Sequence, residues 1–262
     1  MYNFEMTRPS TIADAVTALK EEDAQALGGG QTLIPTLKQR LAMPSVLVSL
    51  TAIGEMQGVC MSDAGEVCVG GATTHATVAR EATAYPGLAA MAARIGDPAV
   101  RNRGTIGGSL ANNDPSACYP AAALASGASI ITNGREIAAD DYFQGMFTTA
   151  LEEGEVVTEV RFPVPEKSHY EKFVQPASRF ALVGVMVAKY ADGVRVAVTG
   201  ASESGVFRWT EAEAALSANF TADALGDLSL DGDGMIADLH GSGAYRAHLV
   251  KVMTGRALKA AI

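Results

Sequence analysis

The feature that most limits the fold is a run of three glycines between a short apolar strand and a helical pattern. Residues 24–27 form the expected strand, and Gly28-Gly29-Gly30-Gln31-Thr32 follows it directly. Leucines then recur at helical spacing as far as Leu41, and Val46 to Leu50 has the pattern of another strand. Together with a strand and a helix expected within residues 4–19, these segments predict a compact βαβαβ unit.

The rest of the chain predicts two further parts that mix helices and strands. Short β-rich runs alternate with helical stretches from about residue 55 to Pro165, which predicts a lobe with an antiparallel sheet. The last part has three strands, two of them joined into a hairpin at Asp192-Gly193, followed by helices. We therefore expect an α+β chain divided into residues 1–54, 55–165 and 166–262.

Composition excludes several classes of function. Hydrophobic residues make up 48% of the chain and charged residues 19%, so the sequence has the material for a large core. A net charge of −9 without a basic cluster argues against nucleic acid as a partner. The sequence has neither a membrane-spanning apolar run nor a secretory start, so we expect a cytoplasmic protein. Three scattered cysteines do not match the four thiolates that usually hold an iron–sulfur cluster.

A second glycine-rich segment supports the interpretation of the first as a phosphate-binding loop. Residues 101–115, RNRGTIGGSLANNDP, are polar in an otherwise apolar chain, and we expect them to form a long functional loop. Glycines let backbone N–H groups approach a phosphate closely, and a helix N-terminus adds a favourable dipole. The first run alone is as consistent with a tight turn as with a phosphate loop. Together, the two loops predict a site for the diphosphate of a dinucleotide between two lobes.

The same two loops carry a resemblance to a known family. GGGQTL at 28–33, followed by Lys38 and Arg40-Leu41, resembles the first FAD loop of the medium, flavin-binding subunit of carbon monoxide dehydrogenase and its relatives. VRNRGTIGGSLA at 100–111 is similar to the second FAD loop nearly residue for residue. The likeness runs from Phe4 through GGATTH at 70–75 to the closing helix. The family includes xanthine dehydrogenases and bacterial hydroxylases of quinoline, nicotine and related heterocycles.

This resemblance implies a fold, a cofactor and a set of binding residues. The fold is a two-lobed p-cresol-methylhydroxylase-type FAD-binding domain, followed by a small C-terminal domain of antiparallel strands and helices. The first loop and the turn from Thr105 to Gly108 would hold the FAD pyrophosphate, and the region after Lys172-Phe173 would approach the flavin ring. No side chain is expected to be catalytic or to bind a metal. The implied cofactor-binding residues are Gly28, Gly29, Gly30, Gln31, Thr32, Leu33, Thr105, Ile106, Gly107, Gly108, Ala111, Asp114, Lys172 and Phe180.

Two positions depart from the family pattern. Cys118 stands where relatives commonly have an aspartate shortly after the Asp-Pro of the second loop. Arg179 precedes Phe180, where many relatives have an aspartate. A thiol and a cation in place of two carboxylates would change the electric field at the flavin and favour a higher reduction potential.

Some polar residues keep two interpretations. For His75, a role at a helix start or in packing is favoured over contact with the cofactor, so it is left out of the predicted site. Arg101 and Arg103 are expected to hold the loop through hydrogen bonds rather than to bind phosphate. Asp114 either caps the helix expected after Pro115 or bonds the ribityl chain, and Phe180 either belongs to the core or contacts the flavin.

The function implied is electron transfer through FAD. The chain would accept electrons from [2Fe-2S] clusters on a small partner subunit, while a large molybdopterin subunit hydroxylates the substrate. Two alternatives remain. One is a self-contained FAD oxidoreductase on the same fold, which would turn over substrate by itself. The other is a flavin-free assembly subunit, which would stay colourless with added FAD.

Overall fold

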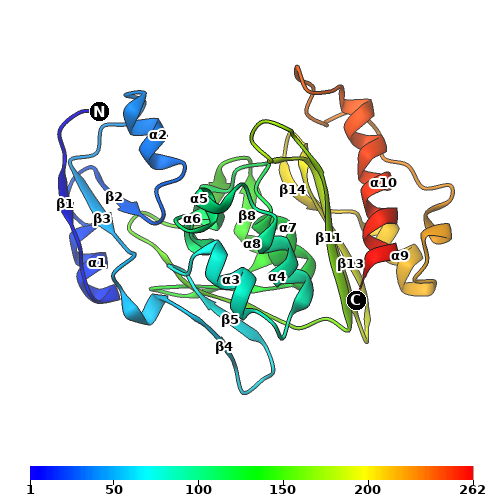
Figure 1. Cartoon of the computed structure of the whole chain (residues 1–262), viewed down its shortest axis with the longest axis horizontal. Coiled ribbons are helices and arrows are strands. Elements are labelled where there is room, and N and C mark those ends of the chain that lie inside the picture. The colour runs from blue at the N-terminus through cyan, green and yellow to red at the C-terminus, as the bar shows by residue number, and fades with distance from the viewer. Residues whose placement is uncertain (262) are drawn as a thin grey trace.

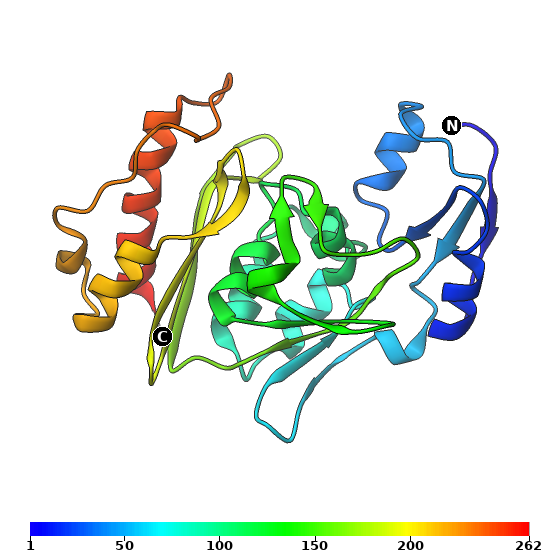
Figure 2. The ribbon, with the colours of Figure 1, turned by 180° about the vertical axis from the view of Figure 1, so that it is seen from behind.

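The structure, a computed structural model, describes residues 1–261 and arranges them as three successive parts in a row. Figure 1 shows the N-terminal lobe at one end, a central lobe of helices and strands, and a sheet backed by helices at the other end. The view from behind in Figure 2 shows the same order of the three parts, with left and right exchanged. The mixture of helix and antiparallel sheet confirms the predicted α+β class.

The N-terminal lobe is the predicted βαβαβ unit. Its three strands are parallel in the order β1-β3-β2, because each helix carries the chain back across the sheet before the next strand begins. The Thr11 side chain accepts a hydrogen bond from the Asp14 N–H at the start of the first helix. The elements are β1 (Glu5–Thr7), α1 (Ile12–Ala18), β2 (Ala24–Leu27), α2 (Leu33–Lys38) and β3 (Val46–Ser49).

The central lobe contains a five-stranded antiparallel sheet in the order β4-β5-β10-β6-β7. A separate two-stranded sheet pairs β8 with β9. The strands are β4 (Val59–Met61), β5 (Val67–Gly70), β6 (Ser129–Thr132), β7 (Glu136–Ala138), β8 (Phe143–Gly145), β9 (Thr148–Thr149) and β10 (Val157–Phe162). The helices are η1 (Gly54–Met56), α3 (His75–Glu81), α4 (Pro86–Ala93), α5 (Pro98–Arg101), α6 (Ile106–Asn112), α7 (Tyr119–Ser126) and α8 (Ala139–Tyr142).

The C-terminal part is a four-stranded antiparallel sheet in the order β11-β12-β13-β14, covered by helices. The predicted hairpin is present, with Tyr190 paired to Gly193. One face of the sheet contacts α4 and α7 of the central lobe, and the other contacts α9 and α10. The elements are β11 (Lys167–Val174), β12 (Ala181–Tyr190), β13 (Gly193–Ser202), β14 (Gly205–Arg208), α9 (Thr210–Ala218), η2 (Ala222–Leu225) and α10 (Gly243–Ala260).

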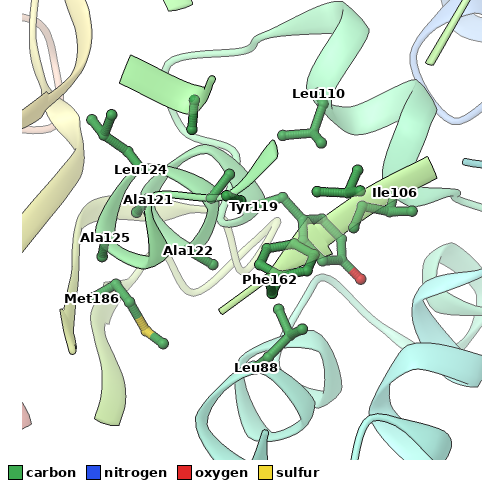
Figure 3. Close-up of a cluster of buried hydrophobic side chains, with 14 of the residues drawn as sticks. Leu88, Ile106, Leu110, Tyr119, Ala121, Ala122, Leu124, Ala125, Phe162 and Met186 are labelled. Atoms are coloured by element: carbon green, nitrogen blue, oxygen red, sulfur yellow. The ribbon is translucent and has the colours of Figure 1, made fainter. Parts of the chain in front are cut away.

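The main core lies in the central lobe and includes residues of the C-terminal sheet. All eight residues of α7 are buried, so this helix lies inside the molecule and has no solvent face. Figure 3 shows Leu88, Tyr119 and Phe162 pointing toward one another, with Met186 of β12 next to Ala122 and Ala125 of α7. A separate core joins the opposite face of the C-terminal sheet to α9 and α10.

Three details differ from the sequence-based expectations. Residues 101–115 are not one loop, because α6 lies within them and continues the packing of the core through Ile106 and Leu110. Helix α2 ends at Lys38, so Leu41 lies beyond it with 73% of its surface exposed. Tyr245 of α10 is 41% exposed, whereas Leu249 and Met253 of the same helix are buried as expected.

Candidate cofactor site

A cavity of about 650 Å³ lies between the N-terminal and central lobes. This volume falls within the range of roughly 300–1,000 Å³ that ligand sites occupy. Both glycine-rich segments line it, and Phe180 from the start of the β12 strand region reaches it as well. The site therefore gathers residues from all three parts of the chain, although its phosphate-binding loops come from only two.

The first glycine loop turns the chain from β2 into α2. Gly30 has φ +73°, a left-handed conformation that glycine adopts without strain, and its carbonyl accepts the N–H of Ile34 in the first turn of the helix. Gly29 is buried against the second loop, where a Cβ would overlap the Arg103 carbonyl group. The close approach of the two loops therefore requires glycine at position 29.

The second loop is fixed by hydrogen bonds to the segment that follows β5. Ile106 N–H donates to the Thr73 carbonyl at 3.1 Å, and Gly107 N–H donates to the Gly71 carbonyl at 2.9 Å. Thr105 caps α6, since its hydroxyl accepts the Gly108 N–H at 3.2 Å. A Cβ on Gly107 would lie 2.6 Å from the Gly71 oxygen, so this glycine is required by backbone packing as well.

Most residues predicted for the site line the cavity, and two do not. Ile106 is fully buried in the main core, and Lys172 is buried with its ammonium among backbone carbonyls. The twelve that line the cavity are Gly28, Gly29, Gly30, Gln31, Thr32, Leu33, Thr105, Gly107, Gly108, Ala111, Asp114 and Phe180. Contact between these twelve residues and FAD remains a prediction.

The Lys172 ammonium is bonded within the protein. It donates to the carbonyl oxygens of Arg94 and Arg179 at 2.8 and 2.9 Å, and it lies 3.7 Å from the Cys118 sulfur. Only 4% of Lys172 is exposed, so these three groups take the place of water around the cation. Arg179 has φ +61° and an exposed side chain, next to cavity-lining Phe180.

Two carboxylates line the cavity, and each has a partner. Glu155 receives hydrogen bonds from Arg135 and from the Thr132 hydroxyl, at 3.0 and 2.6 Å. The Arg135 guanidinium is the main cause that lowers the Glu155 pKa to about 2, so this group is ionised at neutral pH. Asp114 accepts the Ser116 N–H at 2.8 Å and so caps a turn. It does not cap the expected helix, because α7 begins only at Tyr119.

His75 lines the cavity although sequence reasoning left it out of the site. Burial, together with the nearby charge of Arg101, lowers its pKa to about 4, so the imidazole is neutral at pH 7. His75 is also the first residue of α3, which agrees with the expected role at a helix start. The signal in the sequence was the Gly-Gly before Ala-Thr-Thr-His75, because residues that follow a strand end are well placed to line a cleft.

The geometry fits a dinucleotide with a central diphosphate. A Cβ on Gly28 would lie 2.8 Å from the Thr105 hydroxyl and 3.7 Å from Gly108 Cα, so a side chain there would fill the space between the loops. Both loops thus present backbone without side chains to one cavity, an arrangement suited to phosphate oxygens. Leu33, Leu50 and Phe180 supply apolar surface elsewhere in the cavity for planar rings.

Comparisons with known proteins agree with this site. Residues 2–165 match the family described as the FAD binding domain in molybdopterin dehydrogenase. The chain is 32% identical to the carbon monoxide dehydrogenase medium chain of Hydrogenophaga pseudoflava, over 98% of this chain and 96% of the relative. It is 34% identical to the nicotine 6-hydroxylase medium subunit of Paenarthrobacter nicotinovorans, over 95% of this chain and 94% of the relative.

Solved structures show the same likeness in three dimensions. A chain of reconstituted CO dehydrogenase from Oligotropha carboxidovorans is 31% identical, with a TM-score of 0.88 over 98% of this chain and 97% of that one. A chain of quinoline 2-oxidoreductase from Pseudomonas putida 86 is 28% identical, with a TM-score of 0.87 over 99% and 96%.

The fold and the site define a flavoprotein subunit of an oxidoreductase, with FAD as its cofactor. The chain belongs to the family of FAD-binding medium subunits of molybdenum hydroxylases. This confirms the predicted family, cofactor and fold class. The division into residues 1–54, 55–165 and 166–262 stays a prediction. In residues 1–261, no helix is both long and apolar enough to cross a membrane.

Proposed function

We propose that this chain carries electrons through FAD within a complex of three kinds of subunit. It takes electrons from [2Fe-2S] clusters on a small partner subunit and passes them to an external acceptor. A large partner subunit with molybdopterin hydroxylates the organic substrate. The observation that carries the proposal is the FAD cavity between two glycine loops in a chain of the medium-subunit family.

The distribution of cysteines supports an electron source on another chain. Cys60 and Cys68 lie opposite each other on β4 and β5, and Cys118 precedes α7 in the core. Three thiols in two separate places are fewer than the four that usually hold a [2Fe-2S] cluster. Within residues 1–261, no group of three or more His, Cys, Asp or Glu is placed to hold a metal ion.

The residues of this chain would bind and orient FAD rather than perform chemistry on the substrate. Gly28 to Thr32 and Thr105 to Gly108 would hold the diphosphate, and Phe180 would contact the flavin ring. Bound FAD supplies the redox chemistry, because it takes up electrons singly or in pairs. Attachment should be non-covalent, because the cavity-lining residues among 1–261 include no cysteine and one histidine, His75, which is 5% exposed.

Reconstitution tests the proposal. The purified chain with FAD is mixed with the two partner subunits, and flavin absorbance is followed after addition of the organic substrate. We expect bleaching only when all three chains are present. Bleaching of the chain alone at the same rate as the mixture would contradict the proposal and favour a self-contained oxidoreductase. A chain that stays colourless with added FAD would favour a flavin-free assembly subunit.

A further inference from the structure

The imidazole of His75, a residue that lines the FAD cavity, makes no hydrogen bond within the described part of the chain. Among residues 1–261, six fully buried side-chain atoms lack a hydrogen bond: Thr7 Oγ1, His75 Nδ1, the hydroxyls of Tyr119, Tyr142 and Tyr170, and Arg246 Nε. Of the six residues, only His75 lines the cavity. Because Nδ1 is fully buried, a partner in the cavity can be reached only through the other ring nitrogen, Nε2, which is not among the six atoms.

The surroundings hold His75 in a fixed position. Its backbone N–H donates to the Gly104 carbonyl at 2.9 Å, which joins the start of α3 to the second glycine loop. Its ring packs against Tyr119, with centroids 5.3 Å apart, and only 5% of the residue is exposed. A Cβ on Gly104 would lie 2.5 Å from Nε2, so the glycine at 104 allows the ring to lie against the loop.

The imidazole of His75 has a single N–H group that can donate a hydrogen bond. It is neutral at pH 7, and therefore carries a proton on either Nδ1 or Nε2. A proton on Nδ1 would be a fully buried donor without an acceptor, which proteins rarely tolerate. The proton is therefore placed on Nε2, the nitrogen on the side of Gly104. The hydrogen bonds among residues 1–261 include none to Nε2.

We propose that His75 is a FAD-binding residue whose Nε2–H donates to an oxygen of the FAD diphosphate. Gly104 and Thr105 of the second loop both line the cavity beside it, and this loop is the one expected to hold the diphosphate. The N–H groups of Ile106, Gly107 and Gly108 are bonded within the protein, so the neutral imidazole supplies a directed donor that these three groups do not. This inference deepens the FAD site on which the proposed function depends, but it concerns binding and not electron transfer.

The test measures FAD affinity of the flavin-free chain by quenching of flavin fluorescence. His75→Phe keeps a ring and removes the donor, so we expect about 10- to 100-fold weaker binding, as for a hydrogen bond to a charged group. His75→Gln keeps an N–H near the position of Nε2 and should weaken binding less than about fivefold. His248→Phe changes an exposed histidine of α10 and serves as the matched control, with unchanged affinity.

Two spectroscopic readouts separate a direct contact from a loss of packing. Nitrogen NMR of the wild-type protein should show His75 protonated on Nε2, with that resonance shifting when FAD binds. Phosphorus NMR of bound FAD should differ between wild type and the Phe variant, and not between wild type and the His248 control. Equal FAD affinity in wild type and His75→Phe, or a proton found on Nδ1, would overturn the proposal and indicate that ordered water serves the ring.

These outcomes are separate from those of the proposed function. Electron relay is tested by flavin bleaching in the reconstituted complex, whereas His75 is tested by affinity and NMR on the single chain. A chain that binds FAD through His75 but never bleaches would overturn only the relay. A chain that relays electrons with unchanged affinity in His75→Phe would overturn only the role of His75.

Discussion

The ammonium of Lys172 lies 3.7 Å from the sulfur of Cys118, where strand β11 meets the start of α7. Both side chains are buried, and the residue before the cysteine, Ala117, lines the FAD cavity. A thiol is a weak acceptor, so the cation is less well compensated than it would be by a carboxylate.

Cys118→Asp should therefore lower the reduction potential of bound FAD. The added negative charge beside the cavity disfavours the uptake of electrons, an effect that is strong where water is excluded. Spectroelectrochemical titration of the FAD-loaded chain measures the change. Cys60→Asp adds the same charge on exposed β4 and is the control. An unchanged or higher potential in Cys118→Asp would show that this position does not influence the flavin.

Lys172→Met should destabilise the chain by about 2–4 kcal/mol. The substitution keeps an apolar stem of similar length but leaves the Arg94 and Arg179 carbonyls without their donor, and buried unpaired acceptors are costly. Urea denaturation of the flavin-free protein gives the free energy of unfolding. Lys167→Met, at an exposed position of the same strand, should cost less than about 0.5 kcal/mol. Equal stability of the two variants would contradict the assigned contacts.

Gly29→Ala should reduce FAD affinity at least about tenfold, because the two glycine loops must move apart. The new Cβ would overlap the Arg103 carbonyl and lie 2.5 Å from Gly104 Cα, and backbone cannot yield as a side chain does. Gly54→Ala is the control, since a Cβ there meets no atom within 4 Å. The measurement is fluorescence titration with FAD. Unchanged affinity in Gly29→Ala would mean that the spacing of the loops does not matter for binding.

Acidification should destabilise the wild-type protein more than His75→Phe. The unfolded chain takes up a proton on His75 near pH 6.5, but the folded protein does so only near pH 4, because burial lowers the pKa. Between these values the unfolded state binds more protons, so stability falls as pH falls. The loss reaches about 3 kcal/mol by pH 4 and is absent above pH 6.5.

Urea denaturation at a series of pH values checks this. The difference between wild type and His75→Phe is the informative quantity, because titration of other groups cancels in it. Glu155 in particular, whose pKa in the folded protein is about 2, is present in both proteins, so its contribution cancels. Parallel stability curves from pH 7 to pH 4 would show that the imidazole is not buried as described.

The repeating patterns of the sequence predicted the elements well, and the contacts between distant residues were harder to predict. Strand 24–27 and the β12–β13 hairpin follow from apolar runs bounded by glycine turns. Helix α6 was missed because Ile-Gly-Gly-Ser has no helical periodicity. It forms because Thr105 caps it and Leu110 packs in the core. Tertiary packing overrides weak helix propensity there.

The same limit applies to the site. Both glycine loops were recognised because each is a continuous segment, and both line the cavity. His75 was missed because its meaning depends on Gly104, a neighbour in space but not in sequence. Lys172 was expected near the flavin, and its bonds to Arg94 and Arg179 depend on how β11 packs against α4, which no local pattern encodes.

The C-terminal sheet has one apolar face in each of two cores. Hydrophobic burial alone therefore does not fix the register of its strands. Along β12, Val185 and Val187 belong to the outer core while Met186 belongs to the main core, so both faces are apolar. A slip by one residue would exchange the faces at little hydrophobic cost, unlike a slip in a half-solvated sheet. Gly184 prevents this, because the Tyr170 hydroxyl of β11 occupies the space where its Cβ would be. A slipped strand would put a valine beneath that ring, so one glycine selects the correct alignment of the whole sheet.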